Sequence, residues 1–150
     1  MKIGVLSDTH GHIEKQVIDI LTGTDLILHA GDMDSPDLLK TLKKAGQVIA
    51  VRGNMDFGAW TQDIPTEDFV DVGGIRIYLV HDLNQISLDP AAANIRIVIS
   101  GHTHRPAIHK KQGVLYLNPG SASFPRGGFK ASMALIEIDD GQMKCRHIEV

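Results

Sequence analysis

Short apolar runs alternate with amphipathic segments along the first third of the chain. The apolar runs, which are typical of short buried strands, are residues 2–7 (KIGVLS), 25–30 (DLILHA) and 47–52 (QVIAVR). Residues 13–21 carry apolar side chains at helical spacing, and a second helix is expected to start at Ser35-Pro36 and to run to Ala45, before Gly46. This order predicts parallel strands that are joined by right-handed crossovers.

The rest of the chain has a different pattern. Residues 53–65 show no periodicity and are expected to form a long loop, which usually has a functional reason. The strands expected after it are residues 69–72, 75–80, 96–100, 107–111, 114–117, 133–138 and 143–148. Gly73-Gly74 indicates a hairpin, one helical turn is expected near Pro90, and this half is expected to be rich in antiparallel strands. The whole pattern predicts an α/β fold in which two sheets pack face to face with helices outside.

Length and composition fit one globular domain over residues 1–150. Apolar residues make up 43% of the chain and charged residues 22%, which is an ordinary globular balance. The net charge of −3 gives no sign of a nucleic-acid or anionic-membrane partner. No apolar run is long enough to span a bilayer, and the only cysteine, Cys145, forms no intramolecular disulfide, so a cytoplasmic location is expected.

Candidate metal ligands follow the expected strands at the points where these end. They are Asp8 and His10, then Asp32, then Asn54, then His81, and finally His102 and His104. The carboxyl ends of parallel strands meet at one edge of a sheet, so the first three groups should converge, and the others join them if the second sheet packs alongside. Carboxylates that meet without a cation resist ionisation, whereas carboxylate and imidazole together suit Mn, Fe, Zn or Ni. Seven ligands suit two ions that share one carboxylate.

Two divalent ions about 3.5–4 Å apart form a hydrolytic centre. Such a centre activates a bridging water as hydroxide, which attacks a phosphate ester in line, and it neutralises the charge that develops on the phosphoryl oxygens. No covalent intermediate is expected, because the chain has neither a GxSxG elbow nor a recognisable Cys–His pair. Each motif is weak alone, but the order DxH, GD, GN, H, GHxH predicts hydrolysis of a phosphate ester.

This order of motifs resembles the calcineurin-like metallophosphoesterase superfamily, and most of all its small bacterial and archaeal phosphodiesterase branch, often called YfcE-like or MJ0936-like. The resemblance covers residues 3–126 and includes the motifs SDTHG, HAGD, GN, SGHTHRP and LNPGS. It implies the metallo-dependent phosphatase fold, which is a four-layer αββα sandwich of two mixed β-sheets flanked by helices.

The resemblance also implies a role for each candidate residue. One metal would be held by Asp8, His10, Asp32 and His104, and the second by the bridging Asp32 with Asn54, His81 and His102. Asp32, Asn54 and His102 would be catalytic, while Asn54 and Arg126 would bind the phosphate of a small ester substrate. Two divalent ions are implied, with manganese expected and nickel, iron, zinc and cobalt as alternatives.

Three positions depart from the family pattern. Met55 stands where many members have histidine and where this branch often has cysteine, and a thioether cannot donate a proton to a leaving alkoxide. This favours diesters with good leaving groups over monoesters. Val80 precedes His81 where the family usually has glycine. The stretch between His81 and Arg96 is short, so a helix usual there is reduced or missing, and a homo-oligomer could cover the sheet that this exposes.

The leading hypothesis is therefore a metal-dependent phosphodiesterase. The alternatives are a phosphomonoesterase, a scaffold resembling the retromer subunit that shares this fold, and a nuclease, which the net charge disfavours. Asp34 and Asp56 suit either loops or the orientation of ligands. His29 lies inside an apolar strand next to these residues, so it is expected to be structural or to support a ligand rather than to be a ligand itself. The aromatic residues of the 53–65 loop could line the substrate or pack the loop.

Overall fold

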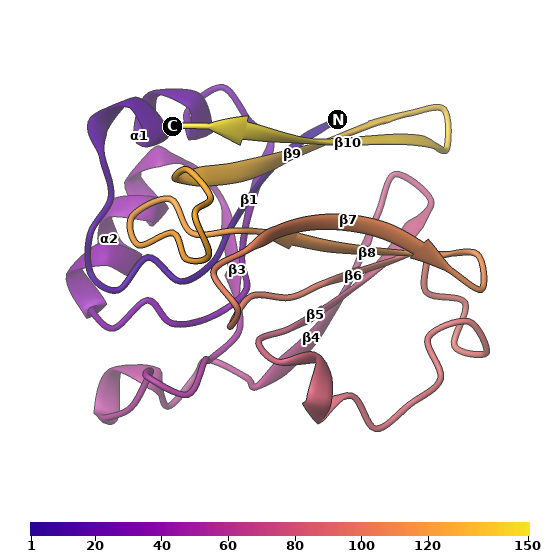
Figure 1. Ribbon diagram of the computed structural model, residues 1–150, viewed down its shortest axis with the longest axis horizontal. Helices are drawn as coiled ribbons and strands as arrows, with labels where there is room; N and C mark the ends of the chain where they lie inside the picture. The colour runs from indigo at the N-terminus through magenta and orange to yellow at the C-terminus, as the bar shows by residue number, and fades with distance from the viewer.

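A computed structural model describes residues 1–150 as two five-stranded sheets that lie face to face (Figure 1). The first sheet has the order β10 (Gln142–Glu149), β9 (Ser132–Asp139), β1 (Lys2–Leu6), β2 (Leu26–His29) and β3 (Val48–Ala50). The second has the order β4 (Glu67–Val72), β5 (Ile75–Val80), β6 (Ile97–Ile99), β8 (Val114–Pro119) and β7 (Pro106–Lys111). Both sheets are mixed, because each contains parallel and antiparallel pairs.

The main core fills the space between the sheets. Inward-facing side chains of alternate strand positions, such as Ile3 and Val5 of β1 and Ile77 and Leu79 of β5, form one cluster of 16 buried apolar residues. Alternation of this kind is the period of a strand, so each sheet turns one apolar face to its partner. The apolar strands expected from the sequence therefore account for this layer.

Helices α1 (Lys15–Leu21) and α2 (Pro36–Ala45) cover the outer face of the first sheet (Figure 1). Leu21 and Leu42 are fully buried in a second apolar cluster beneath them. Ser35 caps α2, because its hydroxyl accepts hydrogen bonds from the N–H groups of Asp37 and Leu38. Both helices occupy the predicted stretches, although α1 begins two residues later than expected.

The outer face of the second sheet carries no α-helix. The segment between β5 and β6 contains only the 3-10 helix η2 (Leu83–Gln85) and one helical turn in which the N–H of Ala93 donates to the carbonyl of Asp89. Ile86 and Leu88 of this segment pack on the outer face of the sheet. The reduced helix and the turn near Pro90 were both expected from the sequence. The 53–65 loop holds a further 3-10 helix, η1 (Ala59–Thr61).

The second half is rich in antiparallel pairs, as the sequence indicated: β4 pairs with β5, β7 with β8 and β9 with β10 in this way. Strands β5, β6 and β8 pair in parallel, because residues 81–96 return the chain to the start of β6 and the β7–β8 hairpin places β8 next to it. The C-terminal hairpin β9–β10 joins the first sheet through antiparallel pairing with β1. The ends of β1, β2, β3, β5 and β6 therefore share one edge of the sandwich. No helix is long and apolar enough to cross a membrane.

Candidate metal centre

Tight turns follow the strands at this edge and carry the candidate ligands. Five of these ligands have positive φ angles between 44° and 70°, which are unfavourable for side chains other than glycine; they are Asp8, His10, Asp32, His102 and His104. Hydrogen bonds between the loops offset the cost of these backbone conformations. The N–H of Asp8 donates to the Gly31 carbonyl and the N–H of His10 donates to the Asp32 carbonyl, both at 3.0 Å. Gly53 leaves room for this arrangement, because a Cβ there would lie 2.0 Å from Asp32 Oδ1.

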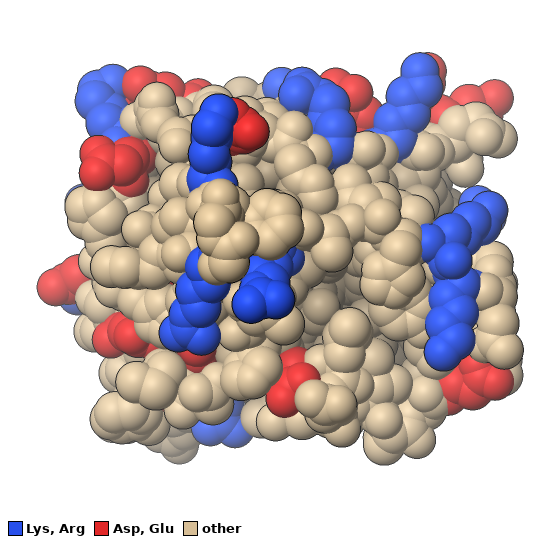
Figure 2. Space-filling model, in the orientation of Figure 1, with Lys and Arg blue, Asp and Glu red and all other residues tan.

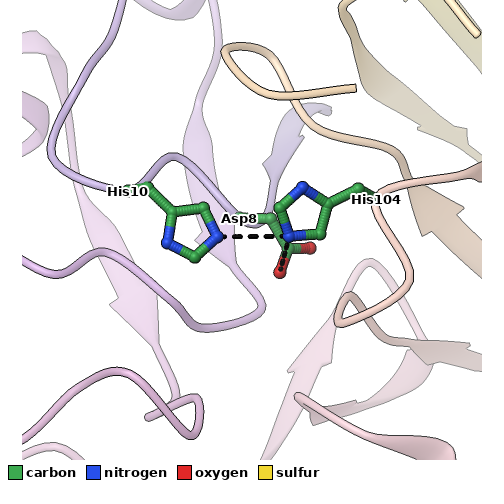
Figure 3. Close-up of side chains that lie close together, drawn as sticks. All are labelled: Asp8, His10 and His104. Carbon is green, nitrogen blue, oxygen red and sulfur yellow. Dashed lines mark hydrogen bonds and ion pairs between the residues drawn. The ribbon is translucent and has the colours of Figure 1, made fainter. Parts of the chain in front are cut away.

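Asp8, His10 and His104 form the first of two ligand clusters (Figure 3). The Nε2 atoms of the two histidines lie 3.1 Å apart, and His104 Nε2 lies 3.4 Å from Asp8 Oδ1. His10 Nδ1 lies 2.7 Å from Asp34 Oδ2, and His104 Nδ1 donates to the Phe124 carbonyl at 2.6 Å. Because each Nδ1 faces an acceptor, each neutral ring turns the lone pair of its Nε2 toward the other ring. Two lone pairs and a carboxylate that converge without a donor fit a cation.

The second cluster has the same chemistry on the other side of the two carboxylates. His81 Nδ1 donates to the Ala30 carbonyl at 2.7 Å, so in the neutral ring the lone pair of Nε2 faces Asp32 Oδ2 at 3.3 Å and Asn54 Oδ1 at 3.0 Å. Burial opposes protonation of this ring, but the carboxylate of Asp32 outweighs burial and raises the pKa of His81, so a cation at this position competes with a proton on Nε2. His102 Nδ1 lies 3.2 Å from the same Asn54 oxygen. Oxygen and nitrogen acceptors again face one another, so this group also fits a divalent ion.

Asp8 and Asp32 lie between the two clusters. His81 Nε2 is 4.0 Å from Asp8 Oδ1, and His10 Nε2 is 3.9 Å from Asp32 Oδ2. Burial raises the pKa of Asp8 above its ordinary value. Burial would also raise the pKa of Asp32, but its contact with His81 and the hydrogen bond from the Met55 N–H outweigh this and lower it. Asp32 is therefore the carboxylate that stays charged most readily.

Two further carboxylates hold the ligand loops, which the sequence had left undecided. Asp34 orients His10 through the Nδ1 contact described above. Asp56 is buried, and its two oxygens accept hydrogen bonds from four backbone N–H groups, those of Asp32, Met33, Asp34 and Gly53, at 2.8–2.9 Å. Asp56 thus ties the loop after β2 to the loop after β3.

His29 is structural, as the sequence indicated. It is completely buried at the end of β2, where Nδ1 accepts a hydrogen bond from the Gly31 N–H and Nε2 donates to Thr9 Oγ1 at 2.9 Å. Burial lowers its pKa from the ordinary value to about 3. The neutral ring therefore joins the loop after β1 to the loop after β2 through these two hydrogen bonds.

Stability of the metal-free protein is expected to fall in acid because of His29. Its pKa in the folded chain lies below the ordinary value near 6.5, so between pH 6.5 and about pH 3 the unfolded chain binds one proton more. Neutral His29 therefore makes its full contribution to the free energy of unfolding above pH 6.5. Below pH 6.5 this contribution falls by up to ~1.4 kcal/mol per pH unit. Denaturant titrations of wild type and His29→Gln test this: the difference between them should shrink below pH 6.5, and a constant difference would refute it.

A groove of about 650 Å³ opens beside His102 on the outer face of the second sheet. The predicted phosphate ligand Arg126 lines this groove, as do Arg105 and Asp82. Neither Arg105 nor Asp82 was predicted to function, although Arg105 directly follows His104 in the SGHTHRP motif. In the face shown by Figure 2, basic side chains lie beside a hollow near the middle.

Two residues of the 53–65 loop are open to solvent. Asn54 is exposed, and Phe57 is 72% exposed, so the ring of Phe57 contributes little to the packing of this loop.

The arrangement of these loops agrees with the family comparison. The model of the calcineurin-like phosphoesterase superfamily domain matches residues 1–141. The chain belongs to this superfamily. A probable metallophosphoesterase of Methanocaldococcus jannaschii is 35% identical, over 99% of this chain and 82% of the relative. The phosphodiesterase MJ0936 of the same archaeon is 28% identical over 96% and 95% of the two chains, which agrees with the expected small branch of the superfamily.

Solved structures of other proteins share the sandwich. An archaeal phosphodiesterase superposes with a TM-score of 0.81 at 25% identity, covering 99% of this chain and 100% of the other. Zinc-bound Vps29 from Entamoeba histolytica superposes with a TM-score of 0.80 at 23% identity, covering 99% and 98%. The predicted fold of two mixed sheets flanked by helices is thereby confirmed, with its fourth layer reduced. As in this metal-dependent phosphoesterase superfamily at large, the chain holds groups of side chains that suit metal ions.

Proposed function

We propose that this calcineurin-like phosphoesterase is a two-metal phosphodiesterase that acts through one domain spanning residues 1–150. The observation that supports it is the convergence of carboxylate oxygens and imidazole lone pairs in two adjoining clusters. One ion would be held by Asp8, His10, Asp32 and His104, and the other by Asp32, Asn54, His81 and His102. Manganese is the expected metal, and a cytoplasmic location stays a prediction.

Side chains around the centre suit the binding of a phosphate. Two divalent cations would act as Lewis acids that neutralise phosphoryl charge and lower the pKa of a nucleophilic water. Asn54 turns Oδ1 toward His81 and His102, which leaves its exposed amide group to donate to a phosphate oxygen. Arg126 lies in the groove next to His102, where its guanidinium can bind an anion. These residues would orient the ester for in-line displacement.

Met55 supports a preference for diesters. Its backbone N–H donates to Asp32 Oδ1 at 2.9 Å, which fixes it next to the centre, and its side chain is 44% exposed. The thioether has no proton to give, so the leaving oxygen must depart without an acid at this position. Esters with good leaving groups tolerate this best.

Turnover of aryl phosphates tests the proposed activity. Protein freed of metal with a chelator is loaded separately with Mn, Ni, Co, Fe or Zn and assayed on bis(para-nitrophenyl) phosphate and para-nitrophenyl phosphate. We expect turnover of the diester with at least one metal and a lower kcat/KM for the monoester. Absence of turnover with all five metals would refute the enzymatic activity and favour the role of an interaction protein. The presence of all seven candidate ligands argues against that alternative.

Met55→His is expected to raise the kcat/KM for the monoester relative to the diester by about tenfold to a hundredfold, because a positioned general acid typically contributes a factor of this size or more. The substitution fits, since the side chain is exposed and its backbone hydrogen bond to Asp32 does not depend on residue type. Met55→Leu serves as the control, and its ratio should match the wild type. An unchanged ratio in Met55→His would mean that this position does not limit the reaction.

A further inference from the structure

Two arginines of the groove form no ion pair within the protein. The side chains of Arg105 and Arg126 are exposed and line the groove together; Asp82 lines it too, but the carboxylate of Asp82 faces His102, at 3.8 Å, rather than either arginine. Arg76 shows the contrast, because its guanidinium donates two hydrogen bonds to the carboxylate of Asp71 at 2.8 and 3.0 Å. Two neighbouring guanidinium groups repel each other, so their placement on one groove suits a ligand that brings negative charge.

The backbone fixes both arginines to the loop that carries His104. His104 Nδ1 donates to the Phe124 carbonyl at 2.6 Å, and the N–H of Arg126 donates to the His104 carbonyl at 3.4 Å. Arg105 follows His104 directly, and its side chain lies against Gly127, where a Cβ would come within 2.9 Å of Arg105 Nε. The arginine pair therefore has a set position relative to the candidate metal centre.

The groove has room for more than a phosphate. Its volume of about 650 Å³ falls within the range for bound organic ligands of nucleotide size. It extends from His102 to His109 and Tyr116, whose rings stack with centroids 5.1 Å apart and planes 7° apart. None of the short contacts within the two ligand clusters involves Arg105 or Arg126. The arginine pair is thus a separate feature of the groove beside the clusters.

We propose that Arg105 and Arg126 bind a second phosphate group of the substrate. The substrate is then a phosphodiester whose organic part lies in the groove and carries a phosphate monoester. Such a group bears close to two negative charges at neutral pH, about −1.5 to −2, and matches two guanidinium groups that each donate a pair of hydrogen bonds. This inference rests on the proposed function, because it assumes that the scissile phosphate lies at the metal centre.

A matched pair of diesters tests the second phosphate. The first is thymidine 5′-(para-nitrophenyl phosphate), and the second is the same compound with a phosphate on the 3′ oxygen. The wild type should show the higher kcat/KM for the phosphorylated compound. Arg105→Gln should lower that value by about tenfold to a hundredfold, mainly through KM, and should leave the unphosphorylated compound nearly unchanged. Arg126→Gln should lower the values for both compounds, and the loss should be larger for the phosphorylated one. Arg96→Gln is the control, because Arg96 is exposed at the other end of β6 and does not line the groove.

Binding to metal-free protein separates this inference from the proposed function. Calorimetric titration should show that wild type binds thymidine 3′,5′-bisphosphate more tightly than thymidine 5′-phosphate, and that either glutamine variant loses the difference. If neither diester turns over but this preference is present, the proposed function fails and the arginine site stands. Equal losses for both diesters in Arg105→Gln would mean that Arg105 binds the scissile phosphate, and equal kcat/KM values in the wild type would mean that no second phosphate is bound; either result would overturn the inference.

Discussion

Replacing Asp32 by asparagine is expected to lower phosphodiester hydrolysis by about a thousandfold or more while the chain stays folded. The carboxylate lies between the two clusters, and its low pKa keeps it charged. In the variant, the amide oxygen can still accept the hydrogen bond from Met55, and the new NH₂ group can donate to the lone pair of His81 Nε2. A neutral amide bridges two cations poorly, and a loss of about 4 kcal/mol of charge stabilisation corresponds to a factor near a thousand.

Three measurements make this result specific to Asp32. Metal analysis should find fewer than two ions per chain in Asp32→Asn, circular dichroism should match the wild type, and excess metal should not restore the rate. Asp63→Asn removes the same charge from an exposed residue that accepts no hydrogen bond from the protein, and it should be fully active. Full activity of Asp32→Asn would contradict the assignment of this residue as a bridging ligand.

Asp56→Ala is expected to weaken metal binding by about tenfold to a hundredfold, the usual cost of losing a residue that orients metal ligands. The substitution removes the acceptor of four backbone N–H groups in a buried site, so the free energy of unfolding should also fall by ~3 kcal/mol or more. Asp56→Asn should behave similarly, because an NH₂ group replaces one of the two carboxylate oxygens and this donor then faces backbone N–H groups.

Metal titration of activity separates Asp56 from the ligands themselves. Because Asp56 acts through the loops of Asp32 and Gly53, a high metal concentration should restore much of the activity of Asp56→Ala, whereas Asp32→Asn should stay inactive. Asp63→Ala, in the same loop, should show the wild-type dependence on metal. If Asp56→Ala binds metal as tightly as the wild type, the role of this carboxylate in positioning the ligands is wrong.

Much of the fold and the grouping of the candidate ligands could be predicted from the sequence. Each ligand motif directly follows an apolar run, and the carboxyl ends of such strands meet at one edge, so the convergence of residues such as Asp8, Asp32 and His81 follows from local patterns. The helix starting at Ser35-Pro36 was equally predictable, because its cap depends on residues next to one another in the chain.

Features that depend on contacts between distant segments could not be predicted. Apolar patterning does not say which strands pair, so the parallel pairing of β6 with β8 and the docking of β9 on β1 were missed. Asp56 looks like an ordinary loop residue until four N–H groups are seen around it. The groove that joins Arg105 to Tyr116 arises only when the β7–β8 hairpin packs beside the loop of His102.

The most direct test of a two-metal phosphodiesterase is a titration of one metal-free sample with manganese, in which bound ions per chain and bis(para-nitrophenyl) phosphate hydrolysis are measured together. We predict that binding saturates at two ions per chain and that the rate rises mainly as the second ion binds. Saturation at one ion or fewer, or two bound ions without hydrolysis, would contradict this account.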